Sequence, residues 1–289
     1  MIQTLTHPDY ARRNATLTLL FTGFLWSSSG LFVKLISWGP FEIWTIRSLI
    51  AAGVLFLYLR HFPRTWTRWQ IIGAVAYMLT QLLFITATKL TTAANVIFLQ
   101  FTAPLYVIIF AYFFLGERPQ RADWRLMPVI FIGMTLFFGD DLTFDSVLGN
   151  VLAIISGITM ALMIVSLRRQ KTGTPAETIL LGNVLGGIAG FYFLFQVPLN
   201  PIDIGIILYL GIFQIGLSLV LYTIAIKHVP ALEATLLVTV EPILNPIWVF
   251  LVIGEVPGPL AIIGGILVLG AITARAVISM RRDTVEVAV

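Results

Sequence analysis

Long apolar runs, separated by short polar segments, dominate the pattern of this chain. Ten such runs are present, at 15–36, 41–59, 69–88, 94–115, 124–139, 148–167, 176–197, 203–226, 232–253 and 258–278. Most approach the roughly 20 residues that a helix needs to cross a bilayer, and hydrocarbon offers no partner for a free backbone amide. The pattern predicts an all-α polytopic membrane protein with ten transmembrane helices. The runs are too long to be strands of a membrane barrel.

A second pattern is a repeat: the segment 89–119 reappears at 227–257, displaced by 138 residues without a gap. The shared positions are a lysine, a proline inside an apolar run and a Gly-Glu-x-Pro turn: Lys89 with Lys227, Pro104 with Pro242, and turn 116–119 with turn 254–257. A match at constant offset is typical of a duplicated unit. We expect five-helix repeats at 15–139 and 140–278, preceded by a cytoplasmic segment at 1–14 and followed by a cytoplasmic tail at 279–289.

Composition agrees with a membrane protein, and charge predicts its orientation. The chain is 58% hydrophobic and 11% charged, with a mean hydropathy of +0.94, whereas soluble domains carry about 25% charged residues. If the N-terminus is cytoplasmic, 15 of the 18 Lys and Arg residues fall in cytoplasmic segments, and only Lys34, Arg47 and Lys89 remain at the outer side. Basic residues favour the cytoplasmic side, so both termini are expected to be cytoplasmic in the cell inner (plasma) membrane.

The repeat and the charge pattern together predict opposite orientations for the two halves. Each half has an odd number of helices, and basic residues surround the first Gly-Glu-x-Pro turn but not the second. Such a 5+5 inverted-topology repeat is typical of secondary transporters, whose substrate site lies near the midplane between the repeats.

These features resemble the EamA-type ten-helix members of the drug/metabolite transporter superfamily. The resemblance rests on the helices with Pro104 and Pro242, on both Gly-Glu-x-Pro turns, and on a first helix that contains Trp26 and ends at Lys34. Within the superfamily the chain looks most like YddG-type exporters of aromatic amino acids. The resemblance implies a five-plus-five helix fold, a central cavity, and efflux of amino acids or related metabolites.

Glu241 is the most informative single residue. It lies about ten residues into the ninth run, directly before Pro242, where the first repeat has Ala103. A carboxylate at membrane depth is costly unless it is paired, hydrated or protonated, so it indicates a functional site. It would bind a substrate ammonium or a coupling proton. The alternative is a local cap on the helix turn that Pro242 weakens.

Polar, aromatic and thioether side chains on other runs complete the predicted substrate cavity. Polar groups in spanning helices prefer the bundle interior or a wet cavity, and the mixture suits an amphipathic ligand. With Glu241, the predicted cavity residues are Trp26, Tyr77, Gln81, Phe84, Tyr106, Met160, Gln214, Tyr222, Asn245 and Trp248. For each of them the alternative is a contact between helices without a ligand.

Prolines and glycines add predictions about helix shape. Pro104 and Pro242 are the predicted hinges of the fourth and ninth helices, with a static kink as the alternative. Gly182, Gly186 and Gly190 recur every four residues, which predicts a close helix contact rather than chemistry.

Several classes of function find no support in the sequence. No phosphate-binding Gly-Lys-Ser/Thr loop is present, so the chain is not expected to hydrolyse ATP. With no cysteine and three separated histidines, we expect no metal, no cofactor and no catalytic centre. Because the basic residues lie between apolar runs, lipid is the expected environment and nucleic acid is not an expected partner.

The expected function is export of small metabolites, with amino acids, including aromatic ones, as substrates. The alternatives are an intramembrane enzyme that acts on a lipid-like substrate and a channel or helper subunit. An enzyme would need a catalytic pair at depth, and the sequence offers only Glu241.

Overall fold

The computed structural model describes residues 8–62, 66–119, 121–140, 143–170, 173–198, 200–226, 228–229, 234 and 237–287. Over these ranges the regular structure is helical and contains no strand. Where the structure describes them, the ten apolar runs coincide with one helix or with consecutive helices, as predicted; residues 232–233 and 235–236 of the ninth run lie outside the described part. Lys227, which the repeat pairs with Lys89, lies outside the described residues.

The first half of the chain, up to residue 140, forms five spans. Its helices are α1 (Pro8–Ser27), α2 (Ser29–Leu35), α3 (Pro40–Leu59), α4 (Arg68–Leu90), α5 (Ala93–Gln100), α6 (Ala103–Leu115) and α7 (Arg121–Leu136). The second half has the same plan. Its elements are α8 (Phe144–Arg169), α9 (Pro175–Ala189), η2 (Phe191–Phe195), α10 (Pro201–Tyr209), η3 (Leu210–Leu217), α11 (Ser218–Ala225), α13 (Val240–Ile253) and α14 (Pro259–Val287).

Length and composition make these helices suitable for a bilayer. Six continuous or nearly continuous spans in the described part of the chain are long and apolar enough to cross: Arg13–Leu35, Pro40–Leu59, Arg68–Leu90, Ala93–Leu115, Phe144–Arg169 and Pro201–Ala225. Three shorter apolar helices accompany them, Met127–Leu136, Val240–Ile253 and Pro259–Ala274. Large apolar side chains such as Leu57, Phe113 and Phe195 lie on the outside and are 71–77% exposed, which suits contact with lipid.

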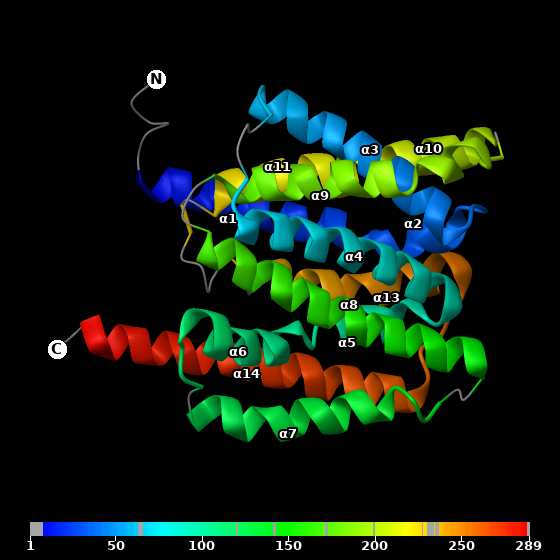
Figure 1. Cartoon of the computed structure of the whole chain (residues 1–289). Helices are drawn as coiled ribbons and strands as arrows, with labels where there is room; N and C mark the ends of the chain where they lie inside the picture. The colour runs from blue at the N-terminus through cyan, green and yellow to red at the C-terminus, as the bar shows by residue number, and fades with distance from the viewer. Residues whose placement is uncertain are drawn as a thin grey trace.

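Helices of the two halves pack mainly against each other (Figure 1). The third span of the first half, α4, lies along α8, the first span of the second half. Reciprocally, α1 in the first span of the first half lies along α11 in the third span of the second half. The second spans, α3 and α9, contact each other, and so do the fifth spans, α7 and α14. This reciprocal pattern is what two copies of one unit produce when a two-fold operation relates them.

The helices place the two repeated turns at opposite ends of the bundle (Figure 1). We call the end where α1 begins and α14 ends the terminal end, and the opposite end the far end. Turn 116–119 follows α6 at the terminal end, and turn 254–257 follows α13 at the far end. Gly116 and Gly254 close these helices with φ values of 74° and 75°. Only glycine adopts this left-handed conformation without strain.

Each repeated turn uses its glutamate to bind the end of the first span of the other half. At the far end, Glu255 Oε2 lies 2.7 Å from Lys34 Nζ at the end of α2. At the terminal end, Glu117 Oε1 lies 2.5 Å from Arg168 Nη2 at the end of α8. The far-end pair is the more buried: its side chains are each 19% exposed, against 48% and 49% in the terminal-end pair.

Further contacts close the far end of the bundle. Lys89 Nζ donates to the carbonyl of Ile36, and the hydroxyl of Ser37 donates to Asp203 on α10. The indole of Trp38 donates to the carbonyl of Pro198, 3.1 Å away. The first bond ties α4 to the end of the first span, and the other two join the segment between α2 and α3 to α10 and to the residues before it, so the far end is held by side chains from both halves.

The spaced glycines Gly182 and Gly186 of α9, and Gly190 directly after it, allow close packing, as predicted. A Cβ atom at Gly182 would lie 2.7 Å from the carbonyl oxygen of Ala74 on α4. At Gly186 it would lie 3.0 Å from the Ser48 hydroxyl on α3. The glycines therefore let α9 approach both helices, and they take no part in the cavity described below.

Candidate functional site

Three spans are interrupted near their middle. The first span breaks at Ser28, the fourth between α5 and α6 at residues 101–102, and the ninth at Thr239 immediately before α13. Positions 101 and 239 differ by 138, the offset of the sequence repeat, so the breaks in the fourth and ninth spans occupy the same place in the two halves. An interrupted backbone is tolerated at membrane depth only where protein buries it or where it lines a cavity.

The predicted hinge prolines lie at these breaks, but they do not bend continuous helices. Pro104 is the second residue of α6 and Pro242 the third residue of α13. In the first turn of a helix proline is favourable, because the amide it lacks would have no partner there. Each proline therefore lies in the first turn of a new half-helix, which differs from the static kink given as the alternative to a hinge.

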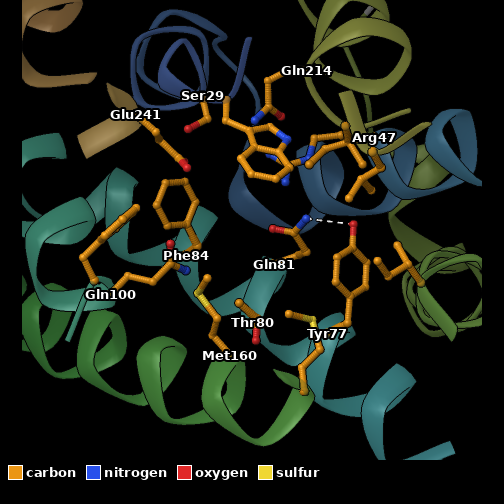
Figure 2. A pocket seen from close by; sticks show the side chains of 16 residues that line it. Ser29, Arg47, Tyr77, Thr80, Gln81, Phe84, Gln100, Met160, Gln214 and Glu241 are labelled. Atoms are coloured by element: carbon orange, nitrogen blue, oxygen red, sulfur yellow. Dashed lines mark hydrogen bonds between the residues drawn. The ribbon is translucent and has the colours of Figure 1, made fainter. Parts of the chain in front are cut away.

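A cavity of about 160 Å³ occupies the region where the interrupted spans meet (Figure 2). Helices of both halves contribute to its wall. Its lining comprises Trp26, Ser29, Arg47, Tyr77, Thr80, Gln81, Phe84, Gln100, Phe101, Met160, Met163, Ile179, Gln214, Ile215, Leu219 and Glu241.

Seven of the eleven predicted cavity residues line this space: Trp26, Tyr77, Gln81, Phe84, Met160, Gln214 and Glu241. The other four lie elsewhere. The Tyr222 ring packs 5.4 Å from that of Trp26, and Tyr106 packs against the largest buried cluster. Asn245 donates to the Ser29 hydroxyl and Trp248 to the Ser27 hydroxyl, which ties α13 to the first span.

One wall of the cavity is a hydrogen-bonded polar group. The Gln81 amide donates to the Tyr77 hydroxyl over 2.9 Å, and Asn183 on α9 donates to the same oxygen over 3.3 Å. Below them, Thr80 donates to Thr159 on α8 over 2.8 Å. These bonds fix the side chains before any ligand arrives, as a pre-formed site requires.

Arg47 is the main residue that the sequence prediction misplaced. The charge pattern assigned it to the outer side, but it lies in the middle of α3, is 3% exposed and lines the cavity. Its Nη1 atom has no hydrogen-bond partner. An arginine within the apolar run 41–59 is costly for the same reason as Glu241, and that signal could have identified it.

Gln214 reaches the cavity from a π-helical segment, η3. Such segments insert an extra residue into a helical turn and are frequent at functional sites. The Oε1 atom of Gln214 is buried and has no partner, so it remains available to accept a hydrogen bond. Hydropathy gives no indication of a π-helical segment, because its residues are as apolar as those of the flanking helix.

Glu241 lies in the first turn of α13, where the positive end of the helix dipole favours a carboxylate. Within the described residues its side chain forms no hydrogen bond or ion pair. The expected alternative, a cap on the Pro242 turn, therefore has no bond to support it. The carboxylate instead belongs to the cavity wall (Figure 2).

Comparison with known proteins identifies the family. The model of the EamA-like transporter family matches the chain twice, at residues 13–139 and 147–274. The pseudopaline exporter CntI of Pseudomonas aeruginosa is 26% identical, over 81% of this chain and 84% of that protein. The threonine/homoserine exporter RhtA of Escherichia coli is 25% identical, over 61% of this chain and 58% of that protein.

The fold is also known from a solved structure. A protein of known crystal structure superposes with a TM-score of 0.62 and 21% sequence identity, over 90% of this chain and 96% of its own. This likeness shows the fold, and the two family matches, which cover most of the chain, show the family. The chain belongs to the EamA-like transporter family of the drug/metabolite transporter superfamily.

Proposed function

We propose that the protein is a secondary exporter that moves small metabolites, chiefly amino acids, through the central cavity by alternating access. The observation that carries this proposal is the cavity itself, which lies where interrupted helices of both halves meet. Discontinuous helices around a midplane site are the usual construction of secondary transporters. The breaks before α6 and α13 then serve as the hinges, with Pro104 and Pro242 beside them.

In this proposal the halves 15–139 and 140–278 are inverted repeats that rock against each other. The distribution of Lys and Arg assigns the terminal end to the cytoplasm and the far end to the outer side. The two equivalent ion pairs, Lys34–Glu255 and Arg168–Glu117, then act at opposite membrane faces. Each joins one half to the other, so each must open when its own side of the cavity opens.

The relatives and the lining support amino acids as the substrate class. One relative bears the name of a threonine/homoserine exporter and another that of a pseudopaline exporter. Trp26, Phe84 and Phe101 supply aromatic contact area in the cavity. Such rings suit an apolar or aromatic side chain, so aromatic amino acids are included in the proposal.

A catalytic role receives less support than transport. An intramembrane acid hydrolase would need a second acid or a base next to Glu241. In the described part of the chain, the cavity lining contains only one other charged residue, Arg47, and no histidine. A channel would instead conduct ions, which the experiment below measures.

Counterflow in vesicles that contain the purified protein tests the proposed function. We expect vesicles loaded with unlabelled phenylalanine or threonine to accumulate the labelled compound transiently. The exchange should saturate with concentration and carry no ionic conductance. Protein-free vesicles are the control. No exchange above that control, or a steady ionic current, would contradict the proposal.

A further inference from the structure

Two ionisable side chains of opposite type, one basic and one acidic, line the cavity without a partner. Arg47 is 3% exposed, and its Nη1 has no hydrogen-bond partner. The Glu241 carboxylate has no bond or ion pair among the described residues. Elsewhere in the described chain the buried polar side chains are mostly hydrogen-bonded, as in other proteins. The cavity therefore holds two ionisable groups that the protein itself does not pair.

The two charges do not neutralise each other. Figure 2 shows Arg47 and Glu241 on opposite sides of the cavity, with Gln81 below them in this view. Ion pairs within 4 Å are formed elsewhere in the described chain, for example by Lys34 and Glu255, but not by these two residues. A buried ion without a partner is strongly unfavourable. An occupant that carries a negative group toward Arg47 and a positive group toward Glu241 would remove both penalties.

We propose that the cavity binds its substrate as a zwitterion, with the substrate carboxylate at Arg47 and the substrate ammonium at Glu241. This inference rests on the proposed transport function and specifies the charges that the substrate must carry. The planar guanidinium offers paired N–H donors that match a carboxylate. The carboxylate of Glu241 accepts hydrogen bonds from an ammonium group.

Other lining residues complete the match. The unpartnered Oε1 of Gln214 adds a neutral acceptor for a substrate N–H. Phe84, Phe101 and Met160 provide apolar surface for the rest of the molecule. The site therefore suits an amphipathic zwitterion, with one carboxylate, one ammonium and an apolar body.

The proposal makes a sharp prediction about derivatives with one charge removed. A derivative that lacks one charge leaves Arg47 or Glu241 unpaired in the occupied cavity. Loss of one partner of a buried charge pair is costly, so we expect each derivative to compete at least about 10-fold less well than the zwitterion. An amide derivative lacks the carboxylate that would bind Arg47, and an N-acetyl derivative lacks the ammonium that would bind Glu241.

The test measures inhibition of amino-acid counterflow by matched derivatives. Phenylalanine and threonine, each with its amide and its N-acetyl derivative, compete at about pH 6, where the α-amino group is charged. For the wild-type protein we expect each zwitterion to compete at least about 10-fold better than either derivative. Equal competition by a zwitterion and its two derivatives would overturn the inference.

Substitutions assign each charge to its residue. Glu241→Gln should lower zwitterion flux and abolish discrimination against the N-acetyl derivative, while discrimination against the amide remains. Arg47→Gln should abolish discrimination against the amide, while discrimination against the N-acetyl derivative remains. Asp145→Asn and Arg125→Gln remove exposed charges outside the cavity and should preserve wild-type discrimination. If both cavity variants lose discrimination against the same derivative, the assignment is wrong.

The outcomes separate this inference from the function on which it rests. If no amino acid exchanges through the wild-type protein, the proposed function fails and the inference fails with it. If exchange occurs without preference for zwitterions, transport stands and only the inference falls. The wild-type competition decides this even where a variant does not fold.

Discussion

Replacing Glu255 with glutamine is expected to release the far end of the bundle and to increase the population of the form that is open there. Glu255 bonds Lys34 over 2.7 Å and also accepts the Ala93 amide at the start of α5 over 2.7 Å. Lys34 in turn donates to the carbonyl of Thr91 over 2.8 Å. One carboxylate thus joins the ends of three helices, and glutamine would leave the lysine without its counter-ion.

The expected size of this effect follows from the burial of the pair. Each side chain is 19% exposed, so the loss lies between that of a surface pair and that of a fully buried one, at about 1–3 kcal/mol. Such a free energy changes the ratio of two conformations by about 5- to 150-fold. The matched variant Glu117→Gln breaks the half-exposed terminal-end pair, and we expect a loss of less than about 1 kcal/mol.

Thiol labelling measures this opening directly, because the chain contains no cysteine. Leu31 packs with Ala93 and Val249 beside the far end and is 8% exposed. A single cysteine introduced by Leu31→Cys should react with a membrane-impermeant maleimide, applied from the far side, several-fold faster with Glu255→Gln. With Glu117→Gln the rate should not rise. An unchanged rate with Glu255→Gln would contradict the role of the far-end pair.

Gly264→Ala is expected to be the most destabilising small substitution at the contact between the fifth spans. A Cβ atom at Gly264 would lie 2.6 Å from the carbonyl oxygen of Gly133 on α7 and 3.0 Å from the Phe137 ring. Because a carbonyl oxygen cannot rotate away, α7 and α14 would have to separate. Overpacking of this kind costs about 1–3 kcal/mol, and Gly264→Leu should prevent folding of the bundle.

Gly270→Ala is the matched control on the same helix, since no atom lies within 4 Å of the position its Cβ would take. Alanine favours a helix over glycine by roughly 1 kcal/mol, so this variant should be as stable as the wild type or slightly more so. Thermal unfolding in detergent compares the two variants. Equal stability of both would show that the close contact of α7 with α14 does not support the bundle.

The helices were predictable because hydropathy and length determine which segments can cross a bilayer. Their interruptions at Ser28, at residues 101–102 and at Thr239 were not, since each break spans only one or two residues inside a run that remains apolar overall. Pro104 and Pro242 marked two of these places, but a proline is compatible with a kink and with a new helix start. The arrangement of neighbouring helices selects between them.

The cavity was predictable in part, through residues whose chemistry conflicts with lipid. Glu241 was identified in this way, whereas Arg47 was assigned to a membrane face by its place in the charge count. That count assigns a residue to a membrane face by its sequence segment. It does not tell which side of the helix the residue lies on, so it could not place Arg47 in the cavity. Pairs such as Lys34 with Glu255 also depend on how distant helices cross, which no local pattern encodes.

Single-cysteine labelling of the two repeated turns tests most directly whether the halves lie in opposite orientations around the cavity. Arg118→Cys and Val256→Cys place one thiol in each turn, at exposed positions, and the chain supplies no other thiol. In intact cells an impermeant maleimide should label the Val256→Cys protein, and should label the Arg118→Cys protein only after the membrane is permeabilised. Labelling of both turns from the same side would contradict the inverted repeat and, with it, alternating access between equivalent halves.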